Sequence, residues 1–347
     1  MKKIVMLVLS FFLIVLAGAG VAAYVLFWAP VVPENLSEKA FVIRRGMSLP
    51  QIADSLAHQG FIKNRDRFIF ANKILKWGNQ LKAGKYFLPP RASTLALYKL
   101  FRSGKAAQQR VTLPEGKTSS DFAGIFRRNM EIDSAAFVRL VEDSSVAKEL
   151  GVKAANLEGY LYPNTYSFFW GVSPPEIVRT LVQEFHRHVN DSLRQRAAAL
   201  NFSLHEVVTL ASIIEGEAVV DSERAVISAV YHNRLRQGIL LQADPTIQYI
   251  VPGPPRRLLN RHLAIDSPYN TYLYPGLPPG PVNNPGIASI RAALYPAPVN
   301  YIYFVARGDG SHVFSRTLAE HLRAKSDFDR VRAQVRREKA ANKARKQ

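Results

Sequence analysis

The strongest constraint on the fold is an uncharged segment at the N-terminus. After two lysines, residues 4–28 carry no charged side chain and are almost entirely apolar. A helix rises about 1.5 Å per residue, so a helix of this length can cross a hydrocarbon layer of about 30 Å. We therefore expect a transmembrane helix at 4–28, followed by a short linker at 29–39.

The residues that flank this segment predict its orientation. Residues 1–3 include two lysines and favour a cytoplasmic N-terminus, whereas Trp28 suits the opposite membrane interface. The remainder of the chain would then lie outside the cytoplasm, anchored by a single pass through the cell inner (cytoplasmic) membrane. The alternative is a cleavable signal sequence, because residues 17–19 match the small-residue pattern of a cleavage site. The apolar residues that follow this site favour the uncleaved anchor.

Composition limits the partners of the exported part. The 347 residues allow about two domains, and 46 basic against 27 acidic residues give a formal charge of +19. Such a charge is typical of nucleic-acid binding, but an exported domain rarely meets nucleic acid, so we expect no nucleic-acid partner. An anionic lipid surface or an acidic wall polymer fits better. The absence of cysteine excludes disulfides and thiolate zinc sites. The basic tail at 331–347 is expected to be solvated.

A short pattern occurs twice and indicates small αβ units. Residues 42–48 predict a strand, a glycine turn and a serine N-cap before an amphipathic helix, and residues 111–118 repeat this order with a threonine cap. Between the copies, residues 81–88 predict a turn and a strand, and residues 95–101 a short helix.

The rest of the chain predicts an α+β fold. Residues 131–201 are mostly helical in pattern, with a tyrosine-rich interruption at 157–166. Residues 242–298 are rich in proline, glycine, asparagine and tyrosine, and long loops of this kind in a compact domain are usually functional. Residues 301–306 and 312–314 predict a two-stranded hairpin.

One carboxylate at the end of an apolar helix is the strongest candidate for chemistry. At about 100° per residue, Glu215 projects on the same face as Val208. Glu217 falls on the opposite side beside Glu206, so we expect only Glu215 to enter a core or cleft. Apolar neighbours disfavour the charged form of a carboxylate, which lets it hold a proton as a general acid does. The alternative is a frayed helix end.

Several reaction classes lose support because their motifs are missing. The sequence contains no phosphate-binding loop, no dinucleotide fingerprint, no zinc-protease motif and no serine nucleophile elbow. What remains is acid chemistry beside polar and aromatic loops. Such loops are typical of carbohydrate sites, where rings stack on sugars and amides bind hydroxyls.

At this point the chain resembles a known family, the endolytic murein transglycosylases, also called MltG-like or YceG-like proteins. The resemblance extends from the membrane helix to about residue 330. The motifs that carry it, in chain order, are Leu113-Pro114-Glu115-Gly116, Leu157-Glu158-Gly159-Tyr160-Leu161-Tyr162-Pro163, Ala211-Ser212-Ile213-Ile214-Glu215, Ser222-Glu223-Arg224, Asn233-Arg234-Leu235, Leu241-Gln242-Ala243-Asp244-Pro245-Thr246, Tyr269-Asn270-Thr271-Tyr272, Gly276-Leu277-Pro278-Pro279-Gly280-Pro281 and Tyr303-Phe304-Val305.

The resemblance implies a domain plan and an activity. It implies a LysM-like module at 40–105, an α+β catalytic domain at 106–330, and Glu215 as the catalytic acid. The expected substrate is the glycan strand of nascent peptidoglycan, cleaved beside the peptidoglycan synthases without a metal or cofactor.

Residues in the matched motifs are the candidate substrate ligands. These candidates are Gln242, Asp244, Thr246, Tyr160, Tyr162 and Asn270. A capping role is the alternative for Asp244, and packing is the alternative for the two tyrosines.

Three functions remain open. In the lytic reaction, Glu215 protonates the oxygen between N-acetylmuramic acid and N-acetylglucosamine, and the muramoyl 6-hydroxyl closes on C1 to leave a 1,6-anhydro end. A muramidase would use water, which normally requires a second carboxylate. The third function is a non-catalytic scaffold that binds the cell wall and recruits synthases.

Overall fold

The structure is a computed structural model that describes residues 2–34, 40–44, 46–104, 108–254 and 256–330. The chain divides into two compact units. The first comprises residues 1–111 and 166–173, and the second comprises residues 112–165 and 174–347. The predicted basic tail and part of the predicted linker, residues 35–39, lie outside the described residues.

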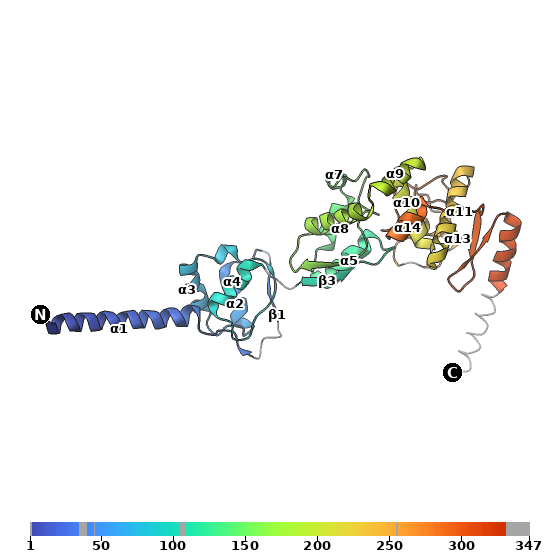
Figure 1. The fold of residues 1–347 in the computed structure, drawn as a ribbon. Helices are drawn as coiled ribbons and strands as arrows, with labels where there is room; N and C mark the ends of the chain where they lie inside the picture. Colours follow the sequence, from blue (N-terminus) through green and yellow to red (C-terminus); the bar gives the residue numbers. More distant parts are fainter. Residues whose placement is uncertain (1, 35–39, 45, 105–107, 255, 331–347) are drawn as a thin grey trace, which may run out of the picture. The chain divides into compact units, whose positions relative to one another are not determined.

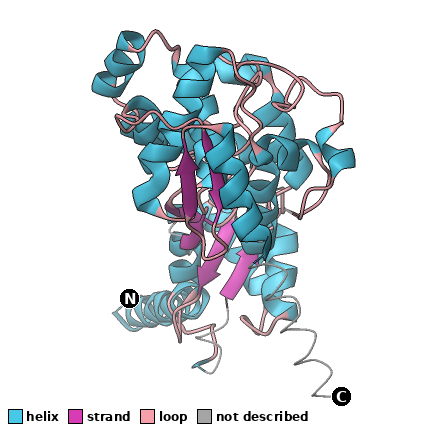
Figure 2. Cartoon of the chain, turned by 90° about the vertical axis from the view of Figure 1, so that its right-hand side faces the viewer, coloured by secondary structure: helices cyan, strands magenta, loops and turns pink. Residues whose placement is uncertain are grey.

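Helices dominate both units, and the strands are short (Figures 1 and 2). In chain order the elements are α1 (Lys2–Phe27), β1 (Ala40–Ile43), α2 (Leu49–His58), α3 (Arg65–Leu75), the 3₁₀ turn η2 (Gly78–Gln80), β2 (Gly84–Phe87), α4 (Thr94–Ser103), β3 (Gln108–Thr112), α5 (Ser119–Met130), α6 (Ser134–Glu142), α7 (Ser144–Glu149), β4 (Thr165–Phe169), α8 (Pro174–His188), α9 (Asp191–Ala199), α10 (Leu204–Glu217), the 3₁₀ turn η3 (Asp221–Glu223), α11 (Arg224–Gln237), α12 (Asp244–Ile250), α13 (Asn260–Leu263), α14 (Ile287–Leu294), β5 (Tyr303–Ala306) and β6 (His312–Ser315).

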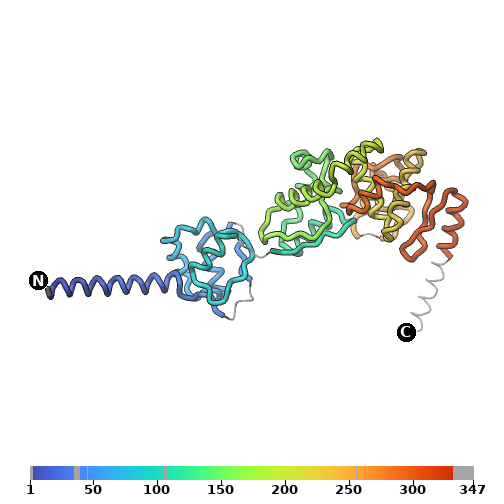
Figure 3. The backbone as a smooth tube through the Cα atoms, viewed as in Figure 1, coloured from blue at the N-terminus to red at the C-terminus, as the bar shows by residue number. Residues whose placement is uncertain are grey.

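The N-terminal helix α1 is continuous, and residues 3–27 are long and apolar enough to cross a membrane. This property is consistent with a single-pass anchor or a signal sequence. Leu26 and Phe27 pack against the core of the first unit. Just beyond the helix, the Val31 backbone N–H donates to the Ala92 carbonyl at 2.9 Å. The end of α1 is therefore joined directly to the first unit (Figure 3).

The first unit contains the first copy of the predicted αβ pattern. β1 pairs antiparallel with β2, with Phe41 opposite Tyr86, and the Gln51 side chain accepts the Ser48 backbone N–H at 2.8 Å where α2 begins. Buried aromatic side chains form much of this core. They are Phe41, Phe61, Phe68, Tyr86, Tyr98 and Phe101. The predicted strand, cap and helix are confirmed here, as is the short helix α4, which ends at Gly104.

The second copy of the pattern begins with β3 and continues into α5. Thr118 caps α5, since its hydroxyl accepts the Asp121 N–H at 3.2 Å while the Asp121 carboxylate accepts the Thr118 N–H at 3.0 Å. β3 pairs with β4, which comes much later in the chain. Because of this pairing, residues 166–173 belong to the first unit, although they lie well beyond residue 105, the predicted end of that module.

The second unit is built around α10. Every residue of this helix from Val207 to Ile214 is buried, as expected for a helix that is apolar on all sides. It packs against α14, α11 and α12, and the first two are labelled beside it in Figure 1. The predicted hairpin is also confirmed, because β5 pairs antiparallel with β6 and places Tyr303 opposite Ser315. The result is a mostly helical α+β structure with an apolar N-terminal helix.

Candidate active site

Glu215 lies near the C-terminal end of α10. Ser203 caps the start of the helix, because its hydroxyl accepts the Glu206 N–H at 3.2 Å. The buried turns of the helix lead directly to Glu215. The side chain of Glu215 is 8% exposed. The expectation that this helix carries Glu215 into a buried environment is therefore confirmed.

Two groups from other elements bind the Glu215 carboxylate. The Gly286 backbone N–H, at the start of α14, donates to Oε2 at 3.0 Å. Arg224 Nη1, at the start of α11, lies 3.3 Å from the same oxygen. Arg224 is held in turn by Asp221, at 3.0 Å, and by Ser289. Both partners bring positive charge to the carboxylate: the guanidinium of Arg224 and the positive end of the α14 dipole at Gly286.

Asn284 holds several loops beside this carboxylate. Its backbone pairs with the chain at Gly116 and Lys117, through two hydrogen bonds of 3.0 Å. Its fully buried side chain accepts the N–H groups of Gly159 and Leu161 at 3.0 Å. The Leu113–Gly116 and Leu157–Pro163 motifs, far apart in sequence, are thus fixed on one residue.

The backbone pairing at Asn284 brings Gly116 and Glu115 to the site. A Cβ atom on Gly116 would lie 3.5 Å from Glu215 Cγ. A Cβ atom on Gly286 would overlap the carboxyl group of Glu115. Both glutamates therefore approach Gly286: Glu115 lies over its α-carbon, and Glu215 accepts its N–H.

A third carboxylate, Glu158, is buried behind these loops. It accepts the Ser119 backbone N–H at 3.1 Å and the Asn284 Nδ2–H at 2.9 Å. Burial raises the pKa of Glu158 to about 7, although these hydrogen bonds oppose the shift. The residue is 7% exposed, so it is suited to holding the loops rather than to meeting a substrate.

The prediction that Glu217 faces away from any core or cleft is wrong. Its carboxylate accepts the Tyr231 hydroxyl at 3.0 Å and lines a cavity of about 400 Å³. Burial and then the charge of Asp244 raise the pKa of Glu217 to about 7. The helical azimuth correctly predicts that Glu215 and Glu217 lie on different sides of α10. However, the side that carries Glu217 is also covered in the folded protein, by α11 and α12.

Two predicted substrate ligands share the cavity of Glu217. Gln242 and Asp244 both line it and are exposed. The Asp244 carboxylate also accepts the Tyr272 hydroxyl at 2.6 Å. Gln242 adopts a left-handed backbone conformation with φ of 50°, which non-glycine residues rarely adopt and which tends to occur at functional sites.

The other predicted ligands are buried and have protein partners. Thr246 and Asn270 are fully buried. The Thr246 hydroxyl donates to the Ala243 carbonyl at 2.7 Å. The Asn270 amide donates to two backbone carbonyls, one at the end of α13 and one just after it. Tyr160 is 2% exposed and Tyr162 is 6% exposed. For the tyrosines these positions favour the packing alternative, since Tyr160 contacts His205 and Phe185, and Tyr162 stacks on His188.

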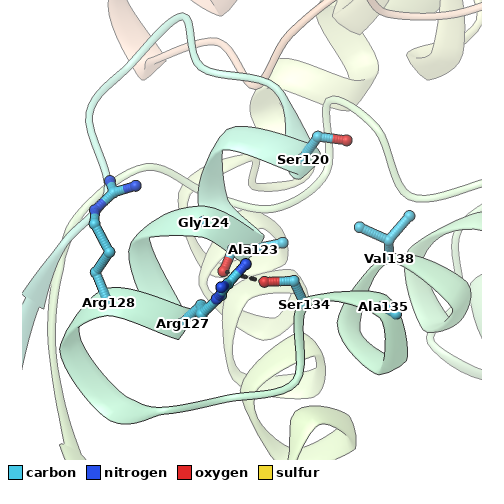
Figure 4. A pocket seen from close by; sticks show the side chains of 8 residues that line it. All are labelled: Ser120, Ala123, Gly124, Arg127, Arg128, Ser134, Ala135 and Val138. Atoms are coloured by element: carbon cyan, nitrogen blue, oxygen red, sulfur yellow. Dashed lines mark hydrogen bonds between the residues drawn. The ribbon is translucent and has the colours of Figure 1, made fainter.

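A separate surface depression of about 540 Å³ lies between α5 and α6 (Figure 4). Its lining includes Arg127, Arg128 and Ser134, but no carboxylate. It therefore offers no group for acid chemistry. Among the residues that the structure describes, no three His, Asp or Glu side chains converge as metal ligands.

Four residues at the site had no role assigned from the sequence. Glu115 and Arg224 lay within recognised motifs, whereas Asn284 and Gly286 lay in a proline- and glycine-rich loop without a pattern of its own. The spacing of these residues in the chain gives no signal that they meet, because tertiary contacts alone bring them to Glu215.

Known proteins are similar to this chain in sequence and fold. The model of the YceG-like family matches residues 41–327. A Bacillus subtilis protein named endolytic murein transglycosylase is 31% identical over 315 residues, which cover 86% of this chain and 87% of that protein. A protein of the same name from Streptococcus pneumoniae is 29% identical over 92% of this chain and 65% of its own length. A crystal structure of a YceG-like protein from Listeria monocytogenes aligns with a TM-score of 0.58 and 33% identity, over 82% of this chain and 98% of that one. On this sequence match, which spans most of the chain including the whole site around Glu215, the protein belongs to the YceG-like family, whose named relatives are endolytic murein transglycosylases.

Proposed function

We propose that this protein is a membrane-anchored lytic transglycosylase that cleaves peptidoglycan glycan strands internally, with Glu215 as its acid and base. Family membership supports the class of reaction. The observation that carries the assignment of the residue is the burial of the Glu215 carboxylate against the loops that the family motifs form.

The reaction uses one carboxylate twice. Protonated Glu215 gives its proton to the oxygen between N-acetylmuramic acid and N-acetylglucosamine as the bond to C1 breaks. The resulting carboxylate then accepts the proton of the muramoyl 6-hydroxyl as that oxygen bonds to C1. The products are a 1,6-anhydromuramoyl end and a free N-acetylglucosamine 4-hydroxyl, so no water is consumed. Arg224 and the Gly286 N–H stabilise the carboxylate between the two proton transfers.

The remaining features of the proposal concern substrate and location. Gln242 and Asp244 contribute the sugar-binding surface, since both are exposed beside the C-terminal end of α10. The apolar helix α1 holds the protein in the inner membrane with its N-terminus in the cytoplasm. In this position the second unit meets nascent strands near the peptidoglycan synthases, and their cleavage would end strand elongation.

The decisive experiment replaces Glu215 by glutamine. The amide keeps the shape of the side chain but delivers no proton, so turnover should fall by at least about 10²-fold while the melting temperature stays nearly unchanged. The substrate is purified glycan, and products are weighed by mass spectrometry, because anhydro and reducing ends differ by one water.

Glu206→Gln is the matched control for this experiment. It makes the same charge change on the same helix, and glutamine can still serve in the capping box, so activity should stay near that of the wild type. Residual activity above about a tenth in Glu215→Gln contradicts the assignment of the acid. Reducing ends in the wild-type digest would show a muramidase instead, and intact glycan would show a binding scaffold.

A further inference from the structure

The Glu215 environment poses a chemical problem for an acid. A guanidinium and a helix N-terminus both bind its carboxylate. Positive groups of this kind stabilise a carboxylate, whereas the proton donor is the neutral carboxylic acid. An opposing negative charge beside Glu215 would correct this balance. The structure places one such charge there, on Glu115.

The position of Glu115 is fixed by the backbone. Gly116 donates to the Asn284 carbonyl at 3.0 Å, and Asn284 donates to the Lys117 carbonyl at 3.0 Å. This bridge directs the Glu115 side chain onto Gly286, where it occupies the space that a Cβ atom would fill. Glycine at 286 is thus what allows the second carboxyl group to lie beside the first.

We propose that Glu115 is a positioning residue whose negative charge, held against Gly286, opposes Arg224 and the start of α14 and thereby favours the protonated form of Glu215. This inference rests on the proposed function. It assigns the control of the Glu215 proton to a residue of the Leu113–Gly116 motif.

The surrounding charges are consistent with this coupling. The pKa of Glu115 is raised, first by partial burial of its carboxyl group and then by the negative charge of Glu215. Arg224 lowers this pKa, and Asp221 raises it further. Burial and then the charge of Glu115 raise the pKa of the Tyr162 phenol, whose other charged neighbours include Glu184, Arg187 and Arg291. Lys117 is exposed two residues from Glu115.

The test is the pH profile of kcat/KM for anhydro-product formation by the full-length protein in detergent. Glu115→Gln removes the negative charge, so the alkaline limb should move to lower pH. Because Glu115 is exposed to solvent, screening weakens its interaction with Glu215. We therefore expect the alkaline limb to shift by about half to one pH unit. Activity at low pH should approach that of the wild type.

Gly286→Ala provides an independent variant. The added methyl group overlaps the Glu115 carboxyl group and should displace it, which would reproduce the shift with Glu115 unchanged. Glu115→Asp in the Gly286→Ala background shortens the side chain while keeping the charge, so the limb should return toward its wild-type position. Glu142→Gln, on the exposed face of α6, is the control for a lost carboxylate and should leave the profile unchanged.

The possible outcomes separate this inference from the proposed function. If Glu215→Gln is inactive but the alkaline limb of Glu115→Gln coincides with that of the wild type, the role of Glu115 is overturned and the acid stands. A uniform loss of activity at every pH, with a lowered melting temperature, would show that Glu115 is merely structural and would also overturn it. If Glu215→Gln stays active, the proposed function itself fails.

Discussion

At the scale of single residues, the site is a set of carboxyl groups with different surroundings. Glu215 has a guanidinium and a backbone N–H, Glu115 has solvent and a glycine, and Glu158 is enclosed with an amide and an N–H. Because burial and neighbouring charges set protonation, these three groups of one chemical type are suited to different tasks.

Glu158 gives a testable link between protonation and stability. Its pKa of about 7 in the folded protein exceeds the ordinary value of 4.5, so the native state binds more protons than the unfolded state between these pH values. The free energy of unfolding should therefore fall as the pH rises from about 4.5 to 7 and then level off, by at most about 3 kcal/mol from this group.

The variant Glu158→Gln should weaken this dependence, since the amide oxygen can still accept the Ser119 N–H and has no charge to bury. Denaturant unfolding of the wild type and the variant at pH 5 and pH 8 measures the effect. A weaker slope should persist in the variant, because the pKa of Glu217 is also raised to about 7. Identical pH dependence in the two proteins would contradict the assignment.

At the scale of elements, α10 organises the second unit because neighbouring segments cover all of its sides. Ser212 shows how one covering loop is held: its hydroxyl accepts the Val282 N–H at 3.0 Å, and its carbonyl accepts the Asn283 amide at 2.8 Å. The loop that carries Asn284 and Gly286 is therefore fixed to the helix that carries Glu215. Packing at this loop should matter for stability as well as for activity.

Gly159 tests that packing. Its φ is 86°, and a Cβ atom would lie 2.5 Å from Pro281 and 2.9 Å from Val208 on α10. Gly159→Ala should lower the free energy of unfolding by about 2–4 kcal/mol, through backbone strain and overpacking together. Gly238→Ala is the control, because its φ is 67° with nothing within 4 Å, so it should show only the cost of a left-handed backbone, about 1–2 kcal/mol. Equal losses in the two variants would show that the contact with α10 contributes nothing.

At the scale of the whole molecule, the apolar helix α1 leads directly into the first unit. If α1 is an uncleaved anchor, the full-length protein should stay in the membrane fraction after alkaline extraction, since a spanning helix does not depend on charge. Residues from about 34 onward should then be open to protease on the outer side. Release of intact protein at alkaline pH, or a mature N-terminus near Gly20, would indicate a signal sequence instead.

The first unit offers a second test at this scale. Glu115, Arg224, Asn284 and Gly286, which lie around Glu215, belong to the second unit. Anhydro product should therefore stay detectable when residues 40–105 are removed. Retention on insoluble peptidoglycan should weaken, because the removed module is expected to bind glycan. The deletion also removes two residues that lie beside the retained segment 166–173. Ala83 lies 3.7 Å from the position of a Cβ atom built on Gly171, and the Lys85 ammonium lies over the ring of Trp170. A melting curve of the truncated protein shows whether the remainder still unfolds cooperatively, and loss of that transition would contradict a separable binding module.

Features that depend on neighbours along the chain could be predicted from the amino-acid sequence. Apolar length predicted α1, the glycine turns and N-caps predicted the repeated strand and helix at 42–48 and 111–118, and helical period placed Glu215 on a buried face. These properties come from local backbone preference and from side-chain order, which a single segment contains completely.

The groups that surround the candidate acid could not be predicted in this way, because contacts in the folded chain bring them together. The Asn284 bridge and the Gly286 N–H reach Glu215 from segments far from it in sequence, and the Arg224 guanidinium reaches it from the start of the following α-helix. The covering of α10 on its other side gave Glu217 a buried partner that its azimuth did not predict. The reason is physical: burial, charge coupling and hydrogen bonds act through distance in space, and periodicity within one helix contains no information about what packs against it.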